Sequence, residues 1–187
     1  MPMSEAPPEP LVSAARTGSI DAVEALLRFA WPHAFRIAFS IVRDRNVAED
    51  AAQEACAAAF SSIRSLRSSA AFSVWFYRIV VREAFAQERR RKPGPWLSDV
   101  PESATPFTSA IVRLDVLRAL EKLPPRQRAA VGLYYYAQLS SVEIAEIFGI
   151  ADSSVRFHLM QARRRLERSL ADHRDIGCEI RTRQNAH

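Results

Sequence analysis

The chain has 187 residues, 48% of them hydrophobic and 25% charged, a balance that suits a folded protein and excludes an intrinsically disordered one. Its formal charge of +5 weakly favours a polyanionic partner. No apolar run is long enough to cross a bilayer and the N-terminus has no apolar signal core, so we expect a cytoplasmic protein without membrane insertion. Only 5 glycines are present and long stretches lack helix breakers, which predicts an all-α fold.

The beginning of the chain predicts a flexible start followed by one long helix. Residues 1–18 begin with a proline-rich stretch and leave room only for a short helix over 11–16. Ser19 is a suitable N-cap for a helix over 21–42. Pro32 lies inside that helical pattern and predicts a kink or a break at that point.

The next helix, predicted over 47–61, has one face of small residues and one acidic face. Asn46 and Glu49 have the spacing of a capping box, which would start the helix. The alanines of the small face would let a neighbouring helix approach closely. The polar side carries Asp44, Arg45, Glu49, Asp50, Gln53 and Glu54. Exposed carboxylates can receive a basic partner helix, although the pattern taken alone favours an ordinary solvated face.

An aromatic helix follows a polar connector over 61–70, beginning near Ser69 and ending near Lys92. Its rings are interleaved with arginines, which suits single-stranded nucleic acid, because each base stacked on a ring contributes about 1–3 kcal/mol. The alternative is that the rings form core. The residues expected in the core are Phe72, Phe76 and Ile79. Those expected to be partly exposed or in contact with nucleic acid are Trp75, Tyr77, Arg78 and Arg82.

Prolines divide the chain into two parts. Residues 93–108 contain four of them without helical periodicity, which predicts an interdomain linker. A helical pattern resumes at Ser109, and Pro125 is well placed for the first turn of a further helix. For the tail over 172–187 the pattern predicts no particular structure.

Two helices joined by a tight turn are predicted over 140–170. Ser140 and Glu143 have capping-box spacing, and Gly149 can adopt the left-handed conformation that ends a helix. The apolar stripe of the first helix comprises Val142, Ile144, Ala145, Ile147 and Phe148, and that of the second comprises Val155, Leu159, Ala162, Leu166 and Leu170. The opposite face of the second helix is basic. This pattern indicates a helix-turn-helix in a DNA major groove, although an ordinary helical hairpin with solvated arginines also fits it.

Residues 123–170 closely resemble the C-terminal DNA-binding region of bacterial RNA polymerase sigma factors, and most of all that of the extracytoplasmic-function (ECF) group. The resemblance implies that the second helix of the helix-turn-helix reads the minus-35 promoter element. The residues it implies are Ser153, Ser154, Arg156, Phe157, His158, Gln161, Arg163 and Arg164. Gln138, Ala151 and the pair Phe157-His158 depart from the family pattern, which leaves open the minus-35 sequence that is read.

The N-terminal half resembles the same family in the matching order. Residues 44–60 are similar to the segment that docks on the clamp helices of the polymerase β′ subunit, and the polar side described above occupies the matching positions. The connector resembles the part that grips a flipped base of the minus-10 element, and the aromatic helix resembles the promoter-melting helix. The minus-10 residues implied are Arg64, Ser65, Leu66, Arg67, Trp75, Arg78 and Arg82. The two blocks imply one domain over 19–92 and another over 109–171.

Together these resemblances imply an ECF sigma factor that binds core RNA polymerase through the β′ clamp helices and the β flap. It would recognise promoter DNA to initiate transcription and be held inactive by a separate anti-sigma factor. The sequence shows no nucleophile–base pair, metal-ligand spacing or phosphate-binding glycine loop, so we expect no enzyme activity, cofactor or metal. Cys56 and Cys178 are too few and too far apart for a disulfide framework or zinc site, and Cys56 is expected to be a buried reduced thiol. Two alternatives remain: a stand-alone helix-turn-helix regulator, and a sigma-like adaptor that binds protein partners without opening a promoter.

Overall fold

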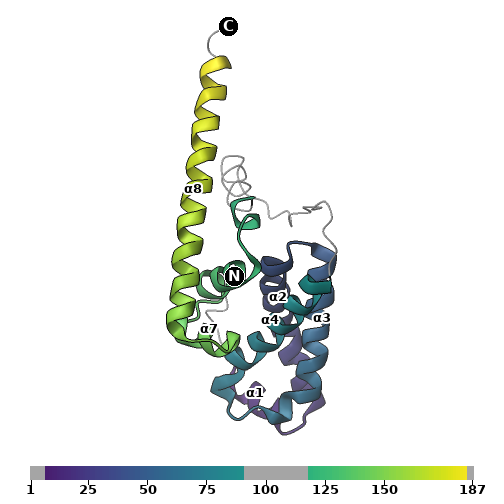
Figure 1. Ribbon diagram of the computed structural model, residues 1–187. Coiled ribbons are helices and arrows are strands. Elements are labelled where there is room, and N and C mark those ends of the chain that lie inside the picture. Colours follow the sequence, from purple (N-terminus) through teal and green to yellow (C-terminus); the bar gives the residue numbers. More distant parts are fainter. Residues whose placement is uncertain (1–6, 91–117, 185–187) are drawn as a thin grey trace.

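The computed structural model describes residues 7–90 and 118–184, and every regular element within these ranges is helical (Figure 1). The all-α prediction is therefore confirmed for the described part of the chain. The N-terminal helices are α1 (Glu9–Arg16), α2 (Ile20–Val42), α3 (Arg45–Ser62), η1 (Ile63–Ser65), η2 (Ser69–Ala71) and α4 (Phe72–Arg90). The C-terminal helices are α6 (Pro125–Val131), η3 (Gly132–Tyr136), α7 (Ser141–Phe148) and α8 (Asp152–Gln184).

The long helix α2 begins at the predicted cap, where the Ser19 hydroxyl accepts a hydrogen bond from the backbone N–H of Ala22 at 3.3 Å. It continues without interruption through Pro32 to Val42, so the expected break does not occur. Ala30 and Ala34 on either side of the proline are completely buried against the neighbouring helices. This packing keeps the helix intact although proline removes one backbone hydrogen bond.

Helix α3 starts two residues earlier than predicted. Asp44 is its N-cap and accepts a hydrogen bond from the backbone N–H of Val47 at 3.2 Å, so the predicted capping box of Asn46 and Glu49 is wrong. Glu49 instead pairs with Arg45, one turn away, at 3.0 Å. The small face is buried as expected, and its members are Ala48, Ala51, Ala52, Ala55 and Ala59. Their size allows α2 and α4 to pack closely on α3.

The aromatic helix α4 supplies the centre of the N-terminal core. Phe72 and Phe76 stack with ring centroids 5.5 Å apart, and both are buried, as is Ile79. Tyr77 is buried completely, which contradicts its expected partial exposure. This burial, together with the nearby Tyr136, raises the pKa of the Tyr77 hydroxyl. Trp75 is half-buried, in agreement with its expected partial exposure.

The segment before the helix-turn-helix is not a simple α-helix end. Pro125 occupies the first turn of α6, as predicted, but the helix changes to π-type hydrogen bonding over η3. Gln138 then takes a left-handed conformation with φ of 56° at the position where the family usually has glycine. The capping box of Ser140 and Glu143 is confirmed by both of its hydrogen bonds.

Within the helix-turn-helix, Gly149 ends α7 with φ of 64°, as predicted, but Val142 does not belong to the buried stripe. Its side chain is 65% exposed, because it lies on the same helix face as the exposed Glu146, one turn later. Helix α8 continues to Gln184, and most of the tail for which the sequence predicted no structure is therefore helical. The predicted linker and the helix start at Ser109 lie outside the described residues.

The two groups of helices pack directly on each other. Helix α2 contacts α6 and η3, while α4 contacts α7. Helix α8 stands at the side of this assembly and projects well beyond it (Figure 1).

Candidate nucleic-acid interface

The acidic side of α3 divides into residues that face solvent and residues used by the helix itself. Asp50, Gln53 and Glu54 are exposed. Asp44 caps the helix, and Arg45 and Glu49 form an ion pair along it. Asp50, Gln53 and Glu54 are therefore the predicted docking residues whose side chains are available to a partner.

An apolar groove beside this acidic side escaped the sequence analysis. It has a volume of about 500 Å³ and lies between α2 and α3, and its lining residues are Ile20, Glu24, Leu27, Arg28, Trp31, Cys56 and Phe60. Ile20 is 72% and Phe60 55% exposed, which is unusual for side chains of this size. The one feature of the sequence that could have indicated this groove was Phe60, a large ring on a helix whose other apolar residues are small.

Cys56 lies in the wall of this groove and is half-buried. Burial raises the pKa of its thiol to about 11, so the thiol stays protonated near neutral pH. The thiol is less buried than the sequence predicts.

In the connector before α4, most of the predicted minus-10 residues have exposed side chains and one has a buried side chain. Arg64, Ser65 and Arg67 are exposed, but Leu66 is only 3% exposed and packs into the core. Leu66 is therefore a wrong assignment as a side-chain contact to DNA. Its backbone is held by Arg16 of α1, whose guanidinium donates to the carbonyl oxygens of Leu66 at 2.8 Å and Arg67 at 3.0 Å. Sequence analysis missed this role because the two segments are 50 residues apart.

Replacing Arg16 with alanine is expected to free the connector without unfolding the helices. Each lost hydrogen bond has a charged donor and contributes about 1.5–3 kcal/mol to the ordering of the loop. We expect slower promoter opening, measured by the fluorescence of 2-aminopurine placed in the minus-10 region. Arg118→Ala is the matched control, because this exposed arginine lies outside the residues proposed to bind polymerase or DNA. Equal opening rates for the two variants would contradict a supporting role for Arg16.

Helix α4 presents its predicted arginines outward, and one of them touches the C-terminal helices. Arg78 and Arg82 are exposed. Arg82 pairs with its neighbour Glu83 at 2.8 Å, whereas the Nη2 atom of Arg78 lies 2.7 Å from Oε1 of Glu146 on α7. Arg78 therefore joins two parts of the molecule that are 68 residues apart in sequence.

The second helix of the helix-turn-helix, α8, has the two faces that the sequence predicts. Val155, Leu159 and Ala162 are buried, and Leu166 is half-buried. Among the predicted minus-35 residues, those that are exposed are Ser153, Arg156, Phe157, Arg163 and Arg164, and those that are half-buried are Ser154, His158 and Gln161. The exposed set lines one side of the first three turns of α8.

Local contacts orient some of these side chains. Arg156 pairs with Asp152 at 3.0 Å, one turn earlier. The Nε atom of Arg163 donates to the Tyr135 hydroxyl at 2.7 Å, and this hydrogen bond raises the pKa of the guanidinium. His158 faces a cavity of about 490 Å³ whose wall includes Phe85 and other residues of α4. His158 is thus less accessible in this arrangement than Arg156.

Comparison with known proteins agrees with this geometry. The family model of sigma-70 region 2 matches residues 23–94, and that of sigma-70 region 4 matches residues 113–166. The chain is 34% identical to the ECF RNA polymerase sigma factor SigM of Mycobacterium tuberculosis, over 91% of this chain and 88% of the relative. The chain belongs to the ECF sigma factors of bacterial RNA polymerase. The predicted resemblance is thereby confirmed.

A further relative and a solved structure are also similar to this sigma factor. The chain is 26% identical to the ECF sigma factor SigW of Bacillus subtilis, over 84% of this chain and 93% of the relative. The fold is similar to that of the sigma factor RpoE of Bartonella quintana, solved with the anti-sigma factor NepR, with a TM-score of 0.69 and 23% identity. That match covers 81% of this chain and 98% of the solved one.

Two kinds of feature are absent from the described residues. None of the helices in residues 7–90 and 118–184 is long and apolar enough to span a membrane. The same part of the chain contains no group of three or more histidine, cysteine or acidic side chains arranged to hold a metal ion.

Proposed function

We propose that the sigma factor binds core RNA polymerase and directs promoter-specific transcription initiation, with catalysis left to the polymerase. The observation that carries this proposal is the ordered pair of region 2 and region 4 matches in one chain. The domain over 19–92 would recognise and open the minus-10 element. The domain over 109–171 would recognise the minus-35 element. Acting on RNA polymerase, the protein would work in the cytoplasm.

Core polymerase would dock through the β′ clamp helices and the β flap. The acidic side of α3 and the apolar groove beside it support the first of these contacts. Asp50, Gln53 and Glu54 can receive basic side chains, while Trp31 and Phe60 offer apolar surface at the groove. Such a combination of charge and exposed apolar surface is typical of a protein-binding site.

Promoter DNA would meet two faces of the sigma factor. The proposed minus-10 contacts are Arg64, Ser65, Arg67, Trp75, Arg78 and Arg82, all at least partly exposed. The proposed minus-35 contacts on α8 are those predicted from the sequence, with Arg156 near the helix start in the position that reaches base edges.

We also propose that a separate anti-sigma factor binds this chain. The likeness in fold to a sigma factor solved with such a partner supports the idea. An anti-sigma factor would co-purify with the tagged sigma factor from uninduced cells and inhibit its transcription when added back. Fully active free protein from such cells would contradict this.

The deciding experiment for the function is run-off transcription. Core polymerase is incubated with genomic fragments in the presence and absence of the sigma factor. Discrete new transcripts are expected only when both are present. A stand-alone regulator would instead bind palindromic duplex by itself, and an adaptor would bind polymerase without producing transcripts.

Reversing two charges on α3 is expected to weaken core binding. The double variant Asp50→Lys/Glu54→Lys should bind core polymerase at least about tenfold more weakly, a difference of about 1.4 kcal/mol. Both side chains are exposed, so circular dichroism should barely change. The control, Glu9→Lys/Glu167→Lys, makes the same change of charge at exposed positions on α1 and α8. Equal binding of the two double variants would remove α3 from the docking site.

A further inference from the structure

Two large apolar side chains are exposed on the face of α8 that the proposed function turns towards DNA. Phe157 is 54% and Met160 is 38% exposed, and the two residues are one helical turn apart. Single exposed apolar residues are ordinary on a protein surface, but neighbouring large ones rimmed by polar residues are typical of a binding site. We name Phe157 and Met160 the apolar pair.

Phe157 lies at the centre of the outward face of α8. Successive residues of a helix are about 100° apart, so Phe157 is about 200° around the axis from Val155 and from Leu159, which are both buried. Along the axis it is about 7.5 Å from Asp152, the first residue of α8. It therefore belongs to the early turns of the helix, which are the part of a groove-inserted helix that reaches base edges.

Polar and cationic side chains surround the apolar pair. Arg156 precedes Phe157, Arg164 lies two turns after it and Ser153 one turn before it, and all three are exposed. This composition is complementary to DNA, because phosphates can take the positive charges while the floor of the major groove presents apolar as well as polar atoms. An apolar protein surface would instead remove water from the two arginines without pairing them.

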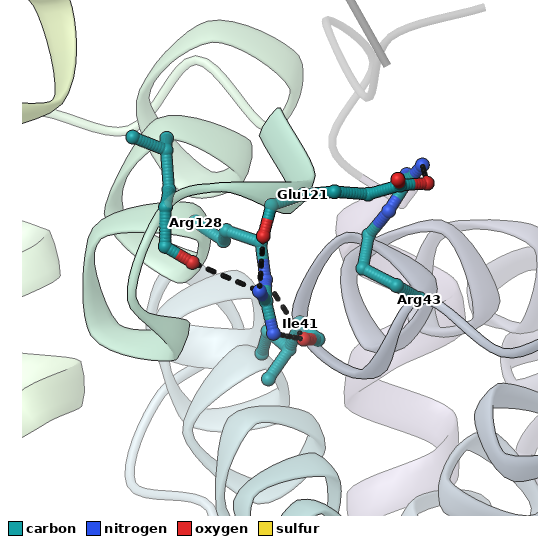
Figure 2. Close-up of polar contacts among 5 residues, drawn as sticks. Ile41, Arg43, Glu121 and Arg128 are labelled. Carbon is teal, nitrogen blue, oxygen red and sulfur yellow. Dashed lines mark hydrogen bonds and ion pairs between the residues drawn. The ribbon is translucent and has the colours of Figure 1, made fainter. Parts of the chain in front are cut away.

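The orientation of α8 is fixed by its neighbours among the C-terminal helices. It packs on α6 and α7. Arg128 of α6 donates from Nη1 to the carbonyl oxygen of Glu121 at 3.3 Å and to that of Leu123 at 2.9 Å, which ties α6 to the residues before it (Figure 2). Side chains on such a supported helix are placed more accurately than side chains on a loop, as recognition of a single base requires.

The methyl group of thymine is the base-edge feature that an apolar ring contacts favourably. In the major groove, guanine presents two acceptors, adenine an acceptor and an amino group, and cytosine an amino group, whereas thymine presents an acceptor beside its C5 methyl group. A phenylalanine ring placed against the other three edges would remove water from polar atoms and offer no hydrogen bond in return. Contact with the methyl group buries apolar surface on both molecules.

We propose that Phe157 recognises a thymine of the minus-35 element through its C5 methyl group, with Met160 extending the apolar contact. The inference rests on the proposed function and names one base that the element contains. Phe157 belongs to the positions at which the chain departs from the family pattern, so this contact is a source of specificity particular to the sequence of this sigma factor.

The test uses deoxyuridine, which pairs with adenine as thymine does and lacks only the C5 methyl group. It starts from a promoter identified by run-off transcription with core polymerase and the full-length sigma factor. Each thymine of the minus-35 element, on either strand, is replaced singly by deoxyuridine. Binding of each duplex is then titrated with holoenzyme that contains the wild-type chain, Phe157→Ala, Phe157→Leu or Val142→Ala.

One deoxyuridine is expected to weaken binding of the wild-type holoenzyme about fourfold, the equivalent of about 0.8 kcal/mol for one methyl group. Phe157→Ala should bind the thymine and deoxyuridine duplexes equally at that position. Phe157→Leu keeps an apolar side chain and should retain part of the difference. Val142→Ala is the matched control, because it removes an exposed apolar side chain of the helix-turn-helix outside α8, and it should respond to deoxyuridine as the wild type does.

Loss of folding does not confuse this result, because Phe157 is exposed and circular dichroism of Phe157→Ala should match that of the wild type. The inference is overturned if no single deoxyuridine weakens wild-type binding, or if deoxyuridine weakens Phe157→Ala as much as the wild type. It is also overturned if Phe157→Ala keeps the deoxyuridine response and loses binding to an anti-sigma factor, since the apolar pair would then be a protein contact.

Transcription separates this inference from the proposed function. A wild-type holoenzyme that transcribes the promoter without any response to deoxyuridine overturns the thymine contact alone. Failure to obtain any promoter that depends on the sigma factor would overturn the proposed function, and the thymine contact with it.

Discussion

Phe76→Ala is expected to lower the free energy of unfolding of the sigma factor by about 3–5 kcal/mol, because the substitution leaves a cavity in the centre of the N-terminal core. Phe76 is completely buried, stacks on Phe72 at 5.5 Å and lies 6.4 Å from the ring of Tyr77. Neighbouring rings on the same helix cannot collapse into the space without changing rotamer. Urea denaturation followed by far-ultraviolet circular dichroism gives the measurement.

The control for Phe76 is a phenylalanine with the opposite environment. Phe60 is 55% exposed at the groove beside α3, so Phe60→Ala should change the free energy of unfolding by less than about 1 kcal/mol. The same variant should weaken core polymerase binding if the groove is part of the docking site. Similar losses of stability for Phe60→Ala and Phe76→Ala would contradict the packing described for α4.

The second large effect is expected on DNA binding, where Arg156→Ala and Arg164→Ala should fail in different ways. Arg156 is exposed near the start of α8, and a bidentate contact from it to a base would contribute about 1–3 kcal/mol of discrimination. Arg156→Ala should therefore bind the preferred minus-35 sequence about 5- to 150-fold more weakly and discriminate less against others. The i,i+4 pair with Asp152 is exposed and easily exchanged for a base contact.

Arg164 lies two turns further along α8 and is expected to meet a phosphate. Arg164→Ala should weaken matched and scrambled promoter duplexes alike and reduce the slope of log affinity against log salt by about one. Titrations of holoenzyme at several salt concentrations measure both quantities. If the two variants lost affinity equally on matched and scrambled DNA, α8 would be an electrostatic anchor and not the reader of the sequence.

Features set by neighbouring residues were predictable from the sequence. The capping box of Ser140 and Glu143, the left-handed Gly149 and the N-cap at Ser19 depend on contacts within a few residues. The cap of α3 shows the limit of such rules. Asp44 and Asn46 are both good caps two residues apart, and the sequence alone does not decide between them, whereas the structure selects Asp44.

Features that depend on distant partners were not predictable. Arg128 binds a carbonyl 87 residues away, and neither residue type nor spacing indicates that partner. The resemblance assigned Leu66 to a DNA contact, but its apolar side chain is buried in the hydrophobic core. Exposure was therefore predictable for most side chains that project from one helix face, and not for Leu66, where the fold of the connector decides which way the side chain points.

The hydrogen bonds from Arg16 to the connector have a practical consequence for work on this protein. The region 2 family match begins at residue 23, and a truncated chain chosen by that boundary would lack α1. Such a fragment would retain α3, α4 and α2 without its first residues, but leave the carbonyl oxygens of Leu66 and Arg67 without their donor. Fragments used in binding studies should therefore begin before Glu9, because a fragment without α1 would show too low an affinity for unpaired minus-10 DNA.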